Sequence, residues 1–266
     1  LSIKLNNYRI IWNYFTSGPN AFGDCYVNGD IECSDLTQFF VFYLRNKEKF
    51  DQINPLKIFR FNISYFLHLL RWNSIRGAKK NIRAHYDMGN NFFGEWLDKK
   101  MQYSSAHFDR KHITLDQAQE NKFESLIKGN EPQPGDHILE IGSGWGSFAF
   151  YLLSRFPDIK IDTLTISREQ HDFVQNKIQQ LGLEDRMQVI YRDYRDHIGQ
   201  YSRIYSIEMF EAVGMQYWQT YFDKVKDLLN PSGVFSMQTI VIFDGLFDRY
   251  AKKIDFIQKY IFPGGM

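Results

Sequence analysis

This sequence of 266 residues has few cysteines, few prolines and no long apolar run. Its two cysteines, Cys25 and Cys33, are too few for a disulfide framework, and the start of the chain does not read as a signal peptide. We therefore expect free thiols in a cytoplasmic protein, although a cross-strand bridge between the two remains an alternative. The most apolar segment, 56–72, contains three basic residues and falls short of the roughly 20 apolar residues of a membrane-spanning helix.

The chain also has almost no net charge. Thirty-two basic residues oppose 31 acidic ones, so the chain as a whole is not a polyanion binder and nucleic acid is not an expected partner. The basic residues are locally concentrated, because residues 57–83 contain seven of them and no acidic one. This segment surrounds an aromatic predicted helix, which suits peripheral contact with an anionic membrane surface. The alternative is a helix packed on the catalytic domain with a basic outer face.

Aromatic residues are abundant, at 17% of the chain. They indicate either a phenylalanine-rich core or a pocket for an apolar ligand. His85, Tyr86, Phe92, Phe93 and Trp96 are candidates for the wall of such a pocket, and ordinary core packing is the alternative for the phenylalanines.

The pattern of residues divides the chain near 74–84, a polar and basic stretch. Residues 1–76 are predicted to form a small α+β, lipid-binding-like domain with a hairpin around Asn28-Gly29, a helix over 34–46 and an aromatic helix from 56. Residues 77–266 alternate β-rich and helical runs, which is typical of a parallel sheet with crossover helices. The predicted strands are 137–141, 160–166, 187–191, 203–209 and 234–242. The predicted helices include 146–155, one capped by Ser167 with Gln170 in a capping box, and 218–229.

A glycine-rich loop follows the first of these strands. Its G-x-G-x-G spacing, with Gly142, Gly144 and Gly146, differs from the G-x-G-x-x-G of dinucleotide-binding folds. The preceding acidic residue, Glu140, suits a cationic sulfonium ligand better than a pyrophosphate. The loop therefore predicts a class I S-adenosylmethionine-dependent methyltransferase domain of Rossmann-like α/β fold. The predicted cofactor cradle comprises Glu140, Gly142, Ser143, Gly144, Trp145 and Gly146.

The ends of the next two strands supply further candidates for cofactor binding. The second strand ends in Leu-Thr-Ile-Ser without the acidic residue that many nucleotide folds place there, so Thr165, Ile166 and Gln170 are the candidates for holding the ribose. After the third strand, Asp193 is placed to accept from an adenine amino group and Tyr194 to cover the ring face. An ordinary solvated turn is the alternative for Asp193.

Eight motifs in order resemble the cyclopropane-fatty-acyl-phospholipid synthases and the related mycolic acid methyltransferases. They are RAHYDMGNNFF, MQYSSAHFD, LEIGSGWGSFA, LTIS-x-x-Q, RDYRD, SIEMFEAVG, MQTI and KYIFPGGM. The resemblance is close over about 81–266 and loose over 1–80. It implies methyl transfer from S-adenosylmethionine to the double bond of an unsaturated phospholipid acyl chain, with Tyr103 and Ser104 touching the cofactor. It also implies a homodimer. The basic, aromatic segment described above predicts a peripherally membrane-associated enzyme, and we expect no metal ion.

The resemblance further implies a bound bicarbonate as the base, held in the family by a Cys, a Glu, a His, main-chain groups and a later Tyr. Glu211 matches the Glu, and Ile240 lies in the segment that follows the His. This sequence departs at two positions, because Ser105 stands where Cys is expected and Gln238 where His is expected. Ser and Gln can still donate to an anion, but Gln cannot titrate as His does.

Three alternatives to cyclopropane formation remain open: a methyl- or methylene-branched product, a small-molecule N-methyltransferase, and a non-catalytic lipid- or cofactor-binding protein. Because this fold needs about two more strands after the fifth, we expect Met266 not to be the native terminus.

Overall fold

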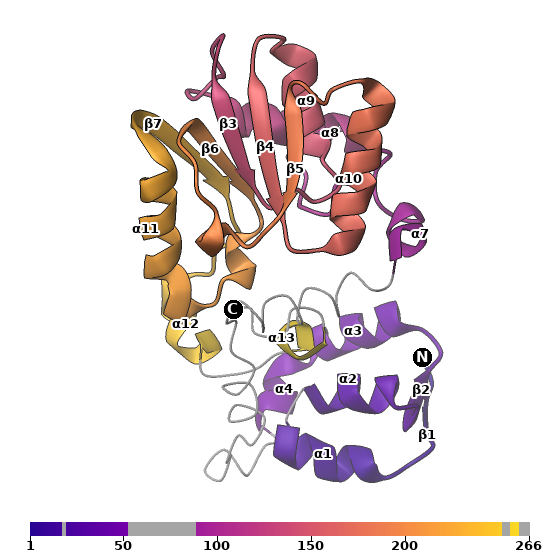
Figure 1. Cartoon of the computed structure of the whole chain (residues 1–266). Coiled ribbons are helices and arrows are strands. Elements are labelled where there is room, and N and C mark those ends of the chain that lie inside the picture. The colour runs from indigo at the N-terminus through magenta and orange to yellow at the C-terminus, as the bar shows by residue number, and fades with distance from the viewer. Residues whose placement is uncertain (18–19, 53–88, 252–255, 261–266) are drawn as a thin grey trace. The chain divides into compact units, whose positions relative to one another are not determined.

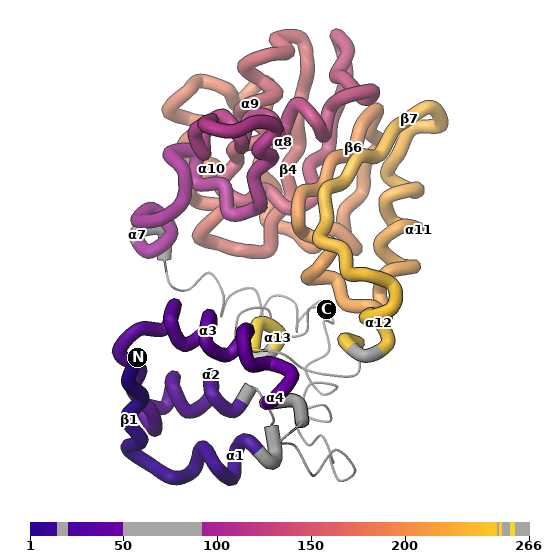
Figure 2. Tube along the Cα trace, turned by 180° about the vertical axis from the view of Figure 1, so that it is seen from behind, coloured from indigo at the N-terminus to yellow at the C-terminus, as the bar shows by residue number. Residues whose placement is uncertain are grey.

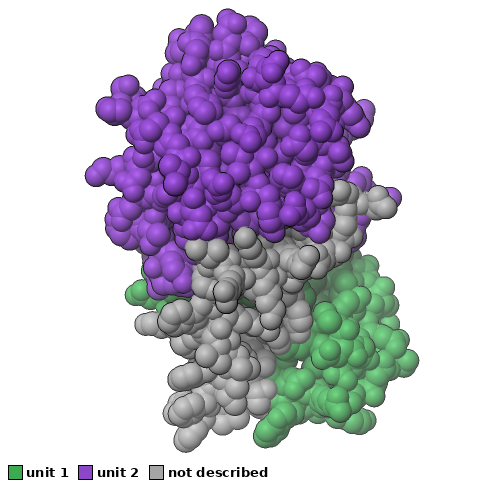
Figure 3. All heavy atoms as spheres, in the orientation of Figure 1, with its two compact units in different colours: residues 1–71, 246–263 green, residues 72–245, 264–266 purple. Residues whose placement is uncertain are grey.

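The computed structural model describes residues 1–17, 20–52, 89–251 and 256–260 (Figure 1). The chain forms two compact units, Leu1–Arg71 with Leu246–Pro263, and Trp72–Gly245 with Gly264–Met266 (Figure 3). The aromatic helix predicted from residue 56, the basic residues of 57–83, His85 and Tyr86 lie outside the described residues. So does the predicted division between residues 76 and 77, which stays a prediction.

The first unit contains a two-stranded antiparallel sheet whose strands are far apart in the chain. Strand β1 (Ile3–Leu5) pairs with β2 (Ile31–Cys33), and helices α1 (Arg9–Ser17) and α2 (Asn20–Val27) lie between them in sequence. The predicted hairpin around Asn28-Gly29 is therefore wrong. A type I′ turn needs positive φ at both central residues, whereas only Gly29 has it, at 73°. Gly29 instead follows the end of α2, where Asp30 N donates to Cys25 O at 2.8 Å.

The predicted helix over 34–46 is present as α3 (Leu36–Arg45), followed by α4 (Lys47–Gln52). Its cap is Asp35, which accepts from Gln38 N at 2.9 Å, while Ser34 accepts from Ser2 N and stands outside the helix. Both cysteines are free thiols, as expected. Helices α12 (Asp244–Ala251) and α13 (Phe256–Tyr260) end the described chain, and most of α12 and all of α13 belong to this unit.

The second unit is built on the predicted parallel sheet. Strands β3 (His137–Ile141), β4 (Lys160–Thr165), β5 (Met187–Tyr191), β6 (Tyr201–Ile207) and β7 (Leu229–Gln238) lie in the order β5-β4-β3-β6-β7. All four neighbouring pairs are parallel. Helices α8 (Leu115–Ile127), α9 (Ser147–Arg155) and α10 (Arg168–Leu181) share one buried cluster with the sheet, and α11 (Trp218–Leu228) shares the other. Figure 2 shows α8 in front of the strands.

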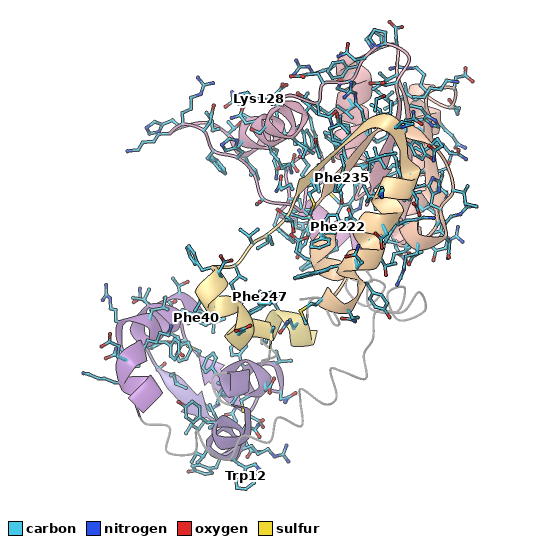
Figure 4. The ribbon with its side chains drawn as sticks, turned by 90° about the vertical axis from the view of Figure 1, so that its left-hand side faces the viewer. Trp12, Phe40, Lys128, Phe222, Phe235 and Phe247 are labelled. Atoms are coloured by element: carbon cyan, nitrogen blue, oxygen red, sulfur yellow. The ribbon has the colours of Figure 1, made fainter. Side chains whose placement is uncertain are left out.

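Side chains alternate between these two clusters, as a sheet covered on both faces requires. Ile138 belongs to the cluster with α9 and α10, and its neighbour Leu139 to the cluster with α11. Figure 4 shows Phe235 on β7 and Phe222 on α11. Phe235 packs against the α11 cluster, and the side chain of Phe222 remains exposed.

Three predicted strands have different bounds in the structure. Strand β4 ends at Thr165 rather than at residue 166, β6 begins at Tyr201 rather than at 203, and β7 begins at Leu229 rather than at 234. Strand β6 stops at Ile207 because Glu208 has a left-handed φ of 44°, so the extended backbone does not continue to Met209 as predicted. Strand β7 ends at Gln238 rather than at residue 242. In the described part of the chain, every helix is too short or too polar to cross a lipid bilayer.

Candidate active site

The glycine-rich loop lies between β3 and α9, at the carboxyl end of the central strand. Gly142, Gly144 and Gly146 all have positive φ, at 98°, 49° and 82°. Gly142 N and Ser143 N donate to Leu164 O at 3.1 and 2.8 Å, which anchors the loop to β4. A Cβ on Gly144 would meet no atom within 4 Å, so the backbone is open there to a ligand.

This loop also lies at the point where the strand order reverses. The chain passes from β3 to β4 in one direction along the sheet and later returns to β6 on the other side of β3. In open α/β sheets, ligands bind at the carboxyl ends of the strands beside such a switch point. The segment after β6 reaches the loop, because a Cβ on Gly142 would lie 3.1 Å from the Met209 side chain.

Glu140 is buried beneath the loop rather than exposed beside it. Its side chain faces β4, where Thr163 Oγ1 donates to Oε2 at 2.7 Å. Burial raises the pKa of Glu140 to about 8, against the lowering effect of the Thr163 hydrogen bond. The carboxyl group is thus protonated at neutral pH in the protein without a cationic ligand.

This raised pKa predicts a pH-dependent stability. The folded protein keeps a proton that the unfolded chain releases, so Glu140 makes the free energy of unfolding fall as pH rises from 4.5 to 8. Glu140→Gln stays neutral throughout. We expect the melting temperature of the variant, relative to wild type, to rise across this window by on the order of 10 °C. Thermal melts without added cofactor check this, and a difference that does not change with pH would contradict it.

The candidates at the end of β4 are joined in one hydrogen-bonded group. Thr165 Oγ1 donates to Gln170 Oε1 at 2.9 Å and accepts from Ser167 N at 3.1 Å. Ser167 caps α10 as predicted and accepts from Gln170 N. The full capping box is wrong, however, because the Gln170 side chain binds Thr165 instead of returning to Ser167 N. Ile166 stands in the same turn, between Thr165 and Ser167.

Asp193 is buried and forms an ion pair with Arg195, which was not among the predicted site residues. Arg195 donates to its carboxylate from Nε at 2.8 Å and from Nη2 at 2.6 Å, and Arg195 N adds a third bond at 3.0 Å. Asp193 is therefore not an ordinary solvated turn residue. Tyr194 packs edge-on against Tyr221 at 5.2 Å, and burial raises the pKa of Tyr194 to about 12, so its hydroxyl stays neutral.

Tyr103 belongs to an aromatic group that reaches the glycine loop. Its ring lies 5.7 Å from Phe93 and 5.6 Å from Trp96, and Phe93 lies 5.1 Å from Trp145 of the loop. Phe93 is fully buried on α7 (Gly89–Gly94), whereas Phe92 and Trp96 remain exposed. Two of the predicted pocket residues, Phe93 and Trp96, are thus brought together with Tyr103.

Ser104 is held by α8 through a buried cation. Lys122 Nζ donates to Ser104 Oγ at 2.7 Å, and Gln119 Nε2 donates to Ser104 O at 3.0 Å. Burial lowers the pKa of Lys122 to about 8, although the charges of Glu208 and Asp98 act in the opposite direction. Lys122 was not among the predicted site residues, because in the sequence it occupies an ordinary polar position of an amphipathic helix.

Ser105 and Gln238, the two departures from the family pattern, meet at Glu208. Ser105 donates to Glu208 Oε1 from N at 2.9 Å and from Oγ at 2.7 Å. Gln238 Nε2 donates to the same oxygen at 2.8 Å and to Ser105 Oγ at 3.1 Å. Glu208 was not among the predicted site residues, because the fourth strand was predicted to run to residue 209, and only the structure places Glu208 after its end.

Glu211 lies on the short 3-10 helix Phe210–Ala212 and is held by the residues that follow Gln238. Its Oε1 accepts from Thr239 Oγ1 at 2.9 Å and from Ile240 N. Its Oε2 is buried and has no hydrogen-bond partner among the described residues. Glu211 and Ile240 are therefore in direct contact, and Gln238 precedes this contact at the end of β7, where it binds Glu208 instead. No group of metal-binding side chains occurs within the described ranges.

A five-stranded parallel sheet in this order, with a glycine-rich loop after its central strand, is the fold of the S-adenosylmethionine-dependent methyltransferases. The chain belongs to the mycolic acid cyclopropane synthetase family, whose model matches residues 73–266. It is 32% identical over 94% of its length to the tuberculostearic acid methyltransferase UfaA1 of Mycobacterium tuberculosis. It is 32% identical over 99% of its length to the cyclopropane-fatty-acyl-phospholipid synthase of Escherichia coli.

Among solved structures, the mycolic acid cyclopropane synthase CmaA1 complexed with SAH and CTAB has a TM-score of 0.65 and 30% identity. That match covers 70% of this chain and 68% of that one. The chain spans 59% of the length of the M. tuberculosis methyltransferase and 66% of the length of the E. coli synthase.

Proposed function

We propose that this chain is the catalytic part of an S-adenosylmethionine-dependent C-methyltransferase that alkylates the double bond of an unsaturated lipid acyl chain. One observation carries the proposal. The open glycine loop and the segment that contains Glu208 and Glu211 lie next to each other, where the strand order of the sheet reverses. S-adenosylmethionine would supply the methyl group from this loop. Family membership and the likeness to a cyclopropane synthase solved with SAH support the choice of cofactor.

The predicted cofactor residues fit such a ligand. Gly144 leaves the backbone accessible, Thr165 and Gln170 offer neutral hydrogen-bonding groups at the end of β4, and Asp193 stands after β5. A sulfonium charge nearby would favour the ionised form of Glu140, so binding would release the proton that burial keeps on this carboxyl group.

The reacting side of the site is suited to a hydrocarbon. An alkene is a weak nucleophile and must meet the methyl group in line and away from water. Phe93 and Trp145 are buried beside Tyr103 and help to exclude water there. Methyl transfer leaves a positive charge on the acyl chain, which the carboxylate of Glu211 is placed to stabilise.

Cyclopropane formation is the first candidate for the product, and a methyl- or methylene-branched chain is the second. The second is favoured by the similarity to a tuberculostearic acid methyltransferase and the first by the similarity to a cyclopropane synthase, both at 32% identity. A small amine as acceptor gains no support from these relatives. A non-catalytic binding protein was suggested by Ser105 and Gln238, but both residues are integrated into a bonded group around Glu208.

The membrane contact and the homodimer also remain proposals. Exposed aromatic residues of the first unit support contact with lipid: Trp12 is 72% exposed and Phe40 is 52% exposed (Figure 4). The basic residues of 57–83, on which the prediction of an anionic surface rests, lie outside the described part.

Mass spectrometry of lipids tests the proposed function. The protein is incubated with unsaturated phospholipid vesicles and methyl-labelled S-adenosylmethionine. We expect the acyl chains to gain one labelled carbon, and fragmentation to distinguish a ring from a branch. Heat-denatured protein is the control. Cofactor binding without any labelled lipid would reject the lipid acceptor.

A further inference from the structure

The bicarbonate site that the family resemblance implies does not fit the donors of this chain. Bicarbonate is an anion and needs hydrogen-bond donors around it. Ser105 N, Ser105 Oγ and Gln238 Nε2 all donate to Glu208 Oε1, and Ile240 N donates to Glu211. The donors are thus occupied by carboxylates of the chain, which would also repel a second anion.

We propose that the carboxylate of Glu208 is itself the base of the reaction and replaces a bound bicarbonate. This inference rests on the proposed function and identifies a further catalytic residue for it. It accounts for Ser105 and Gln238 together, because the two residues that differ from the family pattern bind the same oxygen of the same side chain.

The geometry of Glu208 suits a base. All three of its hydrogen bonds within the described residues end on Oε1, which fixes the carboxylate and leaves Oε2 to accept a proton. The residue follows directly after β6, and the next residue, Met209, touches the glycine loop. Its side chain is partly exposed, so a proton taken from the substrate can pass on to water.

The backbone of Glu208 also indicates a functional position. Its φ of 44° is in the left-handed region, which costs a residue other than glycine about 1 kcal/mol or more. Only two other non-glycine residues with positive φ, Met101 and His112, occur in the described chain. Such a conformation is retained where the surrounding contacts hold it, as Ser105 and Gln238 do here.

The proton step balances without any further reactant. After methyl transfer the acyl chain carries one positive charge. A C–H bond adjacent to the reacting carbons breaks, its electron pair fills the empty orbital of the chain, and the proton forms an O–H bond with Oε2 of Glu208. The lipid becomes neutral, Glu208 becomes an uncharged carboxylic acid, and nothing is oxidised or reduced.

The test compares lipid labelling with and without bicarbonate. In carbon-dioxide-depleted buffer, we expect the wild-type protein to keep its full turnover, and Glu208→Gln to lose on the order of 10²- to 10⁴-fold in turnover. Glu208→Gly removes the carboxylate, suits the left-handed φ and frees the donors of Ser105 and Gln238. We expect added bicarbonate to restore activity to Glu208→Gly and not to Glu208→Gln.

Calorimetric titration with S-adenosylhomocysteine shows whether each variant is folded and binds its ligand. We expect affinities within about threefold of wild type, since the side chain acts on the acyl chain. A wild-type protein that labels lipid only when bicarbonate is present would overturn the role of Glu208 and leave the proposed function intact, as would full turnover by Glu208→Gln. A wild-type protein that labels no lipid under either condition would overturn the proposed function itself.

Discussion

Glu211→Gln is expected to lower turnover on unsaturated lipid by on the order of 10²- to 10³-fold, with little change in the binding of S-adenosylhomocysteine. Thr239 and Ile240 fix one oxygen of the carboxylate, and the other oxygen is buried without a partner in the part of the chain that the structure describes. An amide of the same shape keeps the packing and removes the negative charge that would stabilise the cationic acyl chain. The loss should therefore fall on the chemical step.

The measurement is single-turnover formation of labelled lipid, with binding followed separately by calorimetry. Glu184→Gln is the matched control, because it removes the same charge from an exposed side chain after α10. We expect the control to behave as wild type. Equal turnover in the two variants would show that the charge of Glu211 has no part in the reaction.

Gly146→Ala is expected to weaken binding of S-adenosylhomocysteine by roughly tenfold or more. The added Cβ would lie 2.6 Å from Phe150 and 3.2 Å from Val174, at a backbone φ of +82°. Val174 is fully buried, so it has little freedom to move. The loop must therefore shift away from α9 and α10, and a displaced loop no longer presents its backbone to the ligand.

Gly135→Ala separates the strain of the backbone from the steric contacts. Its φ is +85°, but a Cβ there would meet nothing within 4 Å. In both variants the free energy of unfolding should fall by the roughly 1 kcal/mol that a left-handed alanine costs. Only Gly146→Ala should also bind S-adenosylhomocysteine more weakly. Thermal melts and calorimetric titrations of both variants give the comparison. Unchanged binding in Gly146→Ala would show that the loop does not hold the cofactor.

Local sequence patterns predicted the parallel sheet well, because each strand and each crossover helix has its own hydrophobic period. They were less reliable wherever one local pattern fits two structures. Asn28-Gly29 is a strong hairpin signal, yet here Gly29 follows the end of α2. The strand after it, β2, pairs with β1 near the N-terminus. Gln170 matches a capping box, but its side chain is held by Thr165 instead.

The fold class and the glycine loop could be predicted from the sequence alone, whereas a shared site for Glu211 and Gln238 stays a prediction. Each of these follows from short patterns in order along the chain. The tertiary structure alone decided which groups those residues bind. Ser105 and Glu208 are separated by 103 positions and Gln238 and Glu208 by 30, so no local pattern records their hydrogen bonds. The parallel sheet brings Glu208 and Gln238 together because the carboxyl ends of β6 and β7 lie side by side, and no spacing along the chain records that proximity.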